Sequence, residues 1–182
     1  KPQKPFQLFK QPRVEVPSFD ILRRSGNLIA QLIYRNGCEK QYTLTGLLNG
    51  AIQAAYLCGL YVNEGNWERL RTIMDDEAVE EIRERAETLT PEEITNLKFN
   101  DEDVICSFLH LCCFASRSIL SIMEPKNFSY FVHVVIYVRK NPNVSFDQPP
   151  RQILQNASVG NMHVINIALH RCINPLGFWK IH

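Results

Sequence analysis

The longest apolar stretch of the chain, residues 100–140, constrains the fold more than any other feature. Its first part looks helical, because Asn100 and Asp103 have the spacing of a capping box and Pro125 cannot continue a helix. The few polar residues in between fall mostly within one narrow arc of a helical projection. We therefore expect residues 101–124 to form a core helix that neighbouring elements cover on most sides.

The second part of this stretch, residues 126–140, fits two interpretations. Polar residues recur at the 3-4-4-3 spacing of a helical stripe, whereas β-branched and aromatic residues also occupy every second position, as in a strand. We favour the helix, because the rest of the chain looks helical and no partner strand is evident. The strand stays open as the alternative.

Apolar periodicity and end signals predict further helices on both sides of this stretch. One runs from Phe19 to about Arg35, after a cap at Ser18, and its predicted core face consists of Ile21, Leu22, Leu28, Ile29, Leu32 and Ile33. The next runs from about Leu44 to Val62. It carries a ridge of small residues that would let another helix approach closely: Gly46, Gly50, Ala54 and Cys58. Shorter helices are predicted at about 67–74, 79–89, from Thr90-Pro91 onward, 150–156 and 161–172.

The predicted fold is all-α, with seven to nine helices. A chain of 182 residues with 45% hydrophobic content fits one domain with arms. Residues 18–174 form the predicted helical core, and residues 175–182 form a short apolar tail. Residues 1–17 carry four prolines, which favour an extended arm. The arm can lie on its own domain or on a neighbouring subunit, and both readings stay open.

The cysteines and the apolar stretches bear on the compartment. Four of the six cysteines lie within apolar helical patterns, which favours free thiols in a reducing, intracellular compartment over a disulfide framework. The sequence shows no signal peptide at its start. The two most membrane-like stretches, 44–62 and 104–123, contain polar residues that suit core helices, so we expect no membrane partner.

No motif for catalysis or cofactor binding is present, so we expect a protein that is not an enzyme and has no cofactor, metal or small-molecule substrate. Two pairs have the spacing of metal ligands on a helix, Cys106 with His110 and His163 with His170. Two ligands do not make a site, and packing explains these residues better.

Charge is segregated along the chain. Residues 1–40 carry eight basic and three acidic groups, whereas residues 72–103 carry twelve acidic and three basic groups. The acidic block is either a solvated helix face or a docking surface for a basic partner. The basic parts suggest a groove that binds single-stranded RNA through its phosphates. The candidate residues are Arg23, Arg24, Arg35, Lys40, Arg117, Lys126, Arg139, Lys140, Arg151 and Arg171.

The predicted function is that of a non-enzymatic, self-assembling structural protein, nucleocapsid- or coat-like, whose arms dock on neighbouring subunits in a homo-oligomer. This rests on the general plan of a helical core with two arms. Large apolar side chains in both chain ends would make the contacts: Phe6, Leu8, Phe9, Val14, Val16, Phe178 and Trp179.

An alternative function comes from two short motifs. Leu22-Arg23-Arg24-Ser25-Gly26-Asn27 resembles the death-motif helix of the B-cell-lymphoma apoptosis regulators, with Asn27 in place of the acid. Asn66-Trp67-Glu68-Arg69 resembles the motif that opens the groove of these proteins, with Glu68 in place of glycine. The resemblance covers about ten residues and implies a helical regulator that binds a partner helix in a groove.

Overall fold

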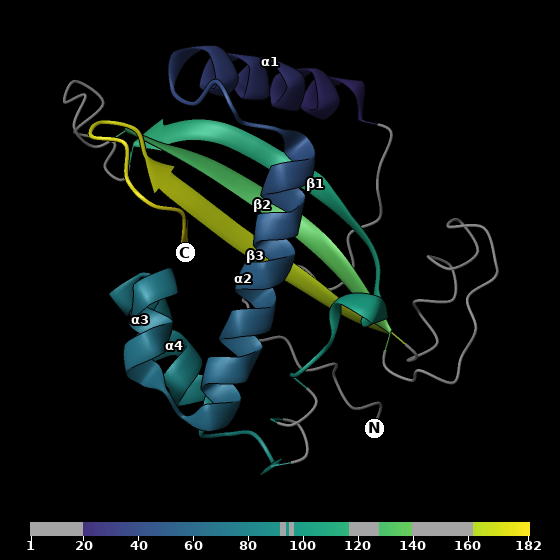
Figure 1. The fold of residues 1–182 in the computed structure, drawn as a ribbon, viewed down its shortest axis with the longest axis vertical. Helices are drawn as coiled ribbons and strands as arrows, with labels where there is room; N and C mark the ends of the chain where they lie inside the picture. Colours follow the sequence, from purple (N-terminus) through teal and green to yellow (C-terminus); the bar gives the residue numbers. More distant parts are fainter. Residues whose placement is uncertain (1–19, 92–93, 95–96, 117–127, 140–161) are drawn as a thin grey trace.

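The computed structural model describes residues 20–91, 94, 97–116, 128–139 and 162–182 (Figure 1). These residues form four α-helices, one short 3-10 turn and a four-stranded antiparallel sheet. The elements are α1 Ile21–Gly37, α2 Leu44–Glu64, α3 Trp67–Ile73, α4 Asp76–Ala86, η1 Asp101–Asp103, β1 Val104–Ser116, β2 Phe128–Arg139, β3 Met162–Cys172 and β4 Lys180–Ile181. Within the described ranges, no helix combines the length and apolarity needed to cross a lipid bilayer.

The prediction of an all-α domain with seven to nine helices is wrong. Residues 104–116, 128–139 and 162–172, all predicted as helical or favoured as such, are the three long strands of the sheet. The reason lies in burial on both faces. In β2, side chains pointing to either side of the sheet are buried, so the strand lacks the clean alternation of a half-exposed strand.

The predicted capping box of Asn100 and Asp103 is present, but it caps only a short 3-10 turn before β1. The backbone N–H of Asn100 donates to Asp103 Oδ2 at 3.0 Å, as in a capping box. The capped element is only the 3-10 turn Asp101–Asp103, and the chain then continues as β1. Pro125 and the predicted helix at 150–156 lie outside the described residues.

The strands follow one another in the order β1-β2-β3-β4, each antiparallel to the next. The pairing of β1 with β2 runs from Ser116 opposite Phe128 to Val104 opposite Val138. It is irregular in two places, one of them at His110, between Leu109 and Leu111. Such a bulge bends the strand and locally disturbs its hydrogen bonding.

The four helices of the first half agree with the predicted positions. Asp20 rather than Ser18 caps α1, by accepting from the Arg23 N–H. Thr43 caps α2, and Asn66 caps α3. Gly65 ends α2 with a φ of 64°, a conformation that glycine adopts without strain.

The main core lies between α2 and one face of the sheet (Figure 1). Tyr130, Val132, Val134 and Ile136 of β2 contribute fully buried or nearly fully buried side chains to it. A smaller cluster around Val135, Tyr137 and Met162 lies on the opposite face of the sheet. Both faces of β2 are therefore apolar and buried.

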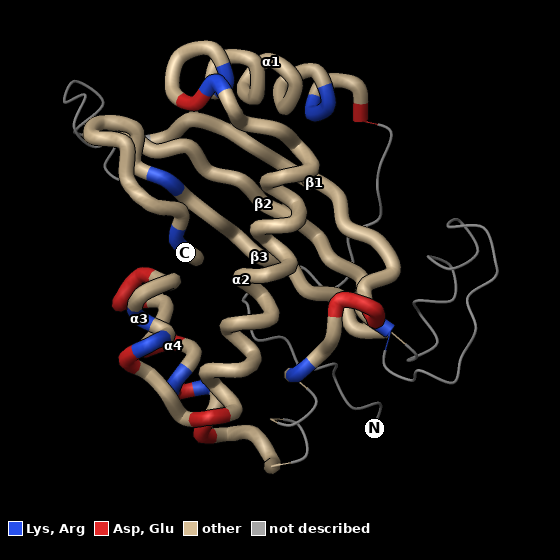
Figure 2. The backbone as a smooth tube through the Cα atoms, in the orientation of Figure 1, with Lys and Arg blue, Asp and Glu red and all other residues tan. Residues whose placement is uncertain are grey.

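The pair α3 and α4 lies beside one end of α2 and carries much of the predicted acidic block (Figures 1 and 2). Its charges are partly paired. Arg71 contacts Glu68, Asp76 and Glu80 at 2.9, 3.7 and 2.7 Å, and Arg85 contacts Glu81 at 3.1 Å. Such exposed pairs add little stability.

Candidate functional site

Helix α1 lies along the sheet beside β1 with an unexpected side inward (Figure 1). Its buried residues are Asn27, Ala30 and Tyr34, spaced three and four apart on one side of the helix. The predicted core face is therefore not the face that meets the sheet.

Asn27 explains this orientation, because its side chain binds the backbone of β1. Its amide donates to the His110 carbonyl at 3.1 Å, and its side-chain oxygen accepts from the Cys112 N–H at 2.9 Å. These two bonds imitate those of a neighbouring strand at the position of the β1 bulge. Asn27 is 8% exposed, so the contact is sheltered from water. The helix thus covers part of an edge strand, which would otherwise invite pairing with another chain.

The six aliphatic residues predicted to face the core instead point outward, and we call them the α1 stripe. Their exposed fractions range from 49% to 84%. Isolated exposed aliphatic residues are common, but a contiguous patch of this kind marks an interaction site. The α1 stripe consists of Ile21, Leu22, Leu28, Ile29, Leu32 and Ile33.

The end of α1 is held by a polar and aromatic cluster. Tyr34 stacks on Tyr130 with ring centroids 4.3 Å apart, and its hydroxyl donates to Glu39 at 3.2 Å. Arg171 donates to the Tyr34 hydroxyl at 3.0 Å and to Glu39 at 2.7 Å, and it also binds the Gly177 carbonyl. Burial is the main reason that the pKa of Tyr34 rises to about 12, so its hydroxyl stays protonated at neutral pH.

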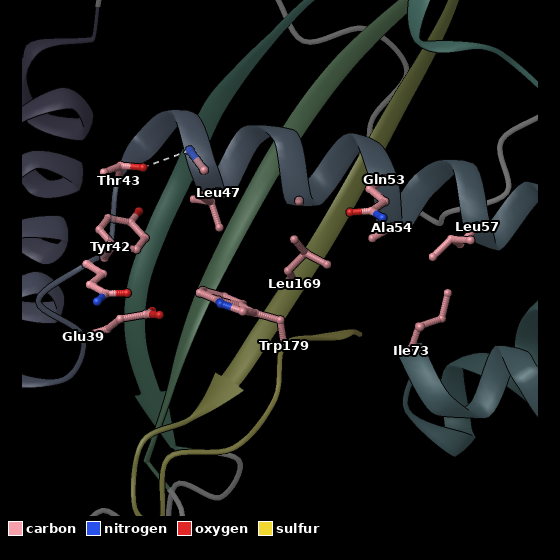
Figure 3. Close-up of a pocket in the computed structure, with 13 residues that line it drawn as sticks. Glu39, Tyr42, Thr43, Leu47, Gln53, Ala54, Leu57, Ile73, Leu169 and Trp179 are labelled. Atoms are coloured by element: carbon pink, nitrogen blue, oxygen red, sulfur yellow. Dashed lines mark hydrogen bonds between the residues drawn. The ribbon is translucent and has the colours of Figure 1, made fainter.

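A cleft of about 470 Å³ lies between α2 and the end of the sheet (Figure 3). Leu47, Ala54 and Leu57 of α2 line one side, and Leu169 and Trp179 line the other. Three members of the predicted small-residue ridge, Gly46, Gly50 and Ala54, border this cleft. The ridge therefore leaves a space beside α2 at these positions, where we predicted a close helix contact. A cleft of this size and lining can hold an apolar side chain or small ligand.

The described members of the predicted RNA groove fall into two separate places (Figure 2). Arg23, Arg24 and Arg35 lie on α1, with Lys40 just after it. Arg171 of β3 lies close to the C-terminal end of α1, where it donates to the Tyr34 hydroxyl and to Glu39.

Arg139 lies at the opposite end of the sheet, where it contacts the Glu102 carbonyl at 3.0 Å. It is nine positions along the β2–β3 pairing from Arg171, or roughly 30 Å. Arg117, Lys126, Lys140 and Arg151 lie outside the described residues. RNA binding stays a prediction.

The predicted assembly residues are also divided. Phe178 is 91% exposed, whereas Trp179 packs within its own chain, against Tyr34, Tyr130 and Arg171. The N-terminal members of the set lie outside the described residues and stay predictions: Phe6, Leu8, Phe9, Val14 and Val16.

The two ligand pairs weighed from the sequence do not share a helix. Cys106 and His110 lie on β1, and His163 and His170 are seven positions apart on β3, which places them on opposite faces of the sheet. All six cysteines are free thiols, and only Cys58 and Cys112 are buried. Burial raises the pKa of Cys58 to about 12, so this thiol is not nucleophilic at neutral pH.

Sequence reasoning missed the outward orientation of α1, although one signal for it exists. Asn27, Ala30 and Tyr34 form a second, narrower stripe at helical spacing, with Arg23 beside it. Arg23 Nη1 lies 3.1 Å from His110 Nε2. Polar side chains such as Asn27 and Arg23 suit the edge of a strand, because its backbone needs hydrogen-bond partners.

A search with protein-family models finds no match to the chain, and no curated protein matches it at significant similarity. The resemblance to the apoptosis regulators implied a helical groove, and the described residues form a mixed fold instead. Asn66 of the second motif caps α3, and Leu22 of the first is exposed on α1. The local structure of both motifs is thus explained without that family.

Proposed function

We propose that the protein is a non-enzymatic, self-associating structural protein in which the α1 stripe is the contact between copies. The observation that carries the proposal is the inverted orientation of α1, which buries Asn27 and leaves six large aliphatic side chains in solvent. Leaving so much apolar surface in water is unfavourable, and association with a similar surface removes it from water.

The exposed area suits a contact between two copies. The six residues together expose about as much surface as four fully exposed aliphatic residues, or roughly 600 Å² per copy. A symmetric contact over this stripe then covers up to roughly 1,200 Å² in total, the lower end of the range for specific interfaces. Residues beside the stripe would add to this area.

The stripe is also complementary to itself in an antiparallel arrangement. Leu28 and Ile29 lie near the middle of the helix, next to the small residues Ser25 and Gly26. A Cβ added to Gly26 would meet no atom within 4 Å. About a two-fold axis near residue 27, the large pair of one copy faces the small pair of the other, as isologous contacts require.

The charges at the ends of α1 favour the same arrangement. Asp20 caps the start of the helix and Arg35 lies in its last turn, and both are exposed. When two copies run antiparallel about the same axis, the end of α1 that carries Asp20 in one copy comes alongside the end that carries Arg35 in the other. This pair would fix the direction of pairing more than its strength.

Sedimentation equilibrium of the full chain tests the proposal. We expect a dimer or larger species for the native protein and a monomer for the double variant Leu28→Asp, Ile29→Asp, because four carboxylates would be desolvated in the contact. Phe178→Asp is the matched control, since it places a carboxylate on another highly exposed apolar residue. A native protein that stays monomeric at every concentration, or a double variant with unchanged mass, contradicts the proposal.

The nucleocapsid- or coat-like version of this function adds single-stranded RNA as a partner. Its support is the group of basic residues on and just after α1, of which Arg24, Arg35 and Lys40 are exposed. They lie beside the α1 stripe, and the antiparallel contact would place Arg35 and Lys40 of the two copies at opposite ends of the pair. Binding of single-stranded RNA stays a prediction.

A further inference from the structure

Three potential metal ligands converge where β3, β4 and the start of α4 meet. They are Asp75, His170 and His182, and one ligand atom from each lies within 4.8 Å of the other two. His170 Nε2 is 2.8 Å from Asp75 Oδ2, and His182 Nδ1 is 3.3 Å from the same oxygen. The three residues are far apart in the sequence, so only the fold brings them together.

Backbone hydrogen bonds fix the positions of Asp75 and His182. The Asp75 N–H donates to the Ile181 carbonyl at 3.0 Å, and the His182 N–H donates to the Ala168 carbonyl at 3.0 Å. Met74 forms a parallel bridge with Ile181, and both side chains are fully buried in the main core. The neighbours Asp75 and His182 therefore point to the other side of the sheet, the side of His170.

The Asp75 side chain does not cap α4, although its position in the sequence would allow it to. It occupies the N-cap position of α4, where an aspartate commonly accepts from the backbone of the first turn. Its side chain makes no such capping bond. The carboxylate instead points toward the two imidazoles, so its position is set by the histidines and not by the helix.

The surroundings also fix the histidine rings. Phe131 stacks on His170 with centroids 5.5 Å apart and an angle of 19° between the ring planes. The ring of His182 packs edge-on against both of these rings. His170 is 3% exposed, whereas the His182 side chain is half-exposed, so the cluster is rigid inside and open to solvent on one side.

We propose that Asp75, His170 and His182 form a binding site for a divalent transition-metal ion of the zinc type. Two imidazoles and one carboxylate are a common ligand set for such ions. Zinc lies about 2.0–2.2 Å from each such ligand atom in a tetrahedral site, which separates the ligand atoms by roughly 3.3 Å. The distances from Asp75 Oδ2 to His170 Nε2 and to His182 Nδ1, 2.8 and 3.3 Å, are close to this value.

The bound ion would connect the C-terminal segment to α4 and keep one coordination position for water. This inference replaces the sequence-based expectation that the chain has no metal site, and it does not depend on self-association. Because binding requires the folded arrangement, the ion would stabilise the native state.

Zinc titration of the chelator-treated full chain, followed by calorimetry, tests the site. We expect one Zn²⁺ per chain and a higher Tm with zinc. His182→Ala should weaken binding at least about tenfold and remove the rise in Tm, because a ligand is lost. Asp75→Asn and His170→Gln should do the same, and His182→Ala stays informative if the buried His170→Gln fails to fold. His163→Gln, which changes another histidine of β3, is the matched control and should bind as the native chain does.

Cobalt provides a second measurement, because the free cysteines could also bind zinc. At the proposed site Co²⁺ should show the visible absorption of a tetrahedral complex without a strong near-ultraviolet sulfur-to-metal band. Two results would overturn the proposal: His182→Ala binding zinc as tightly as the native chain, or a sulfur band that accompanies the single bound ion.

Discussion

Asn27 is the residue that fixes how α1 meets the sheet. It satisfies one donor and one acceptor of β1 in a buried position, and the Cys112 thiol also lies 3.4 Å from its backbone carbonyl. A buried backbone group without a partner costs about 1–3 kcal/mol. The side chain of Asn27 therefore matters more for stability than any aliphatic residue of the α1 stripe.

We expect Asn27→Ala to lower the free energy of unfolding by about 2–4 kcal/mol, because two buried backbone groups of β1 lose their partner. Urea denaturation followed by circular dichroism measures this change. Asn36→Ala is the control, since Asn36 is exposed near the end of the same helix. Equal stability of the two variants would show that the contact between Asn27 and β1 is not important.

His133 makes stability depend on pH. Burial, and to a smaller extent His110 at 5.1 Å between ring centroids, lowers its pKa from 6.5 to about 4. Arg23 Nη1 lies 3.1 Å from His110 Nε2 and so adds positive charge near the pair.

Between pH 6.5 and 4 the unfolded chain binds a proton at His133 that the folded chain does not bind, so stability falls as the pH falls through this window. We expect this histidine to contribute about 1–2 kcal/mol, after allowance for its partial exposure. Measuring urea unfolding across the window should give a flatter profile for His133→Gln than for the native chain. Identical profiles would remove this role of His133.

At the scale of elements, the first half of the chain could be predicted and the second half could not. Local signals such as Thr43 at the start of α2 and Gly65 at its end act within a few residues, so sequence reasoning finds them. The strands depend on partners distant in sequence. Because β2 is buried on both faces, its apolar residues fit a buried helix as well as a strand.

The choice of which side of α1 faces the sheet is a second feature that long-range contacts determine. Helical periodicity identified the α1 stripe, but it does not say whether the stripe faces the chain's own core or another surface. The decision depends on the edge of β1, whose bulge at His110 needs partners that Asn27 supplies. The proposed metal site was missed for the same reason: His170 was considered only with its neighbour in sequence, His163, whereas its contact with Asp75 exists only in the folded chain.

Because of the orientation of α1, substitutions on its outward side should change stability little, whereas substitutions on its buried side should lower stability strongly. Leu28→Asp and Ile29→Asp should change the unfolding free energy of the isolated subunit by less than about 1 kcal/mol, because both side chains are largely exposed. Tyr34→Ala should cost about 3–5 kcal/mol, because Tyr34 is fully buried and stacked on Tyr130. Thermal unfolding at low protein concentration checks this. The reverse order of effects would mean that the α1 stripe faces the core.

At the scale of the whole molecule, RNA binding has a direct test. If RNA lies along the exposed basic residues of α1, binding of single-stranded RNA should weaken steeply with salt, by a slope of about −0.7 per phosphate contact. The variant Arg24→Glu, Arg35→Glu, Lys40→Glu should abolish retention at low salt in filter binding. Lys98→Glu, which changes an exposed lysine outside α1 and just before η1, is the control. Absence of retention for the native chain removes RNA as a partner.

In the proposed self-association two copies meet through the outward side of α1, and disulfide crosslinking of Leu28→Cys tests this contact most directly. Residue 28 lies near the proposed two-fold axis, so oxidation should form a covalent dimer within a background of Cys113→Ser and Cys172→Ser, which removes the two exposed native thiols. Glu84→Cys, exposed on α4, should crosslink much more slowly in the same background. Equal crosslinking at residues 28 and 84, or none at residue 28, would contradict the account.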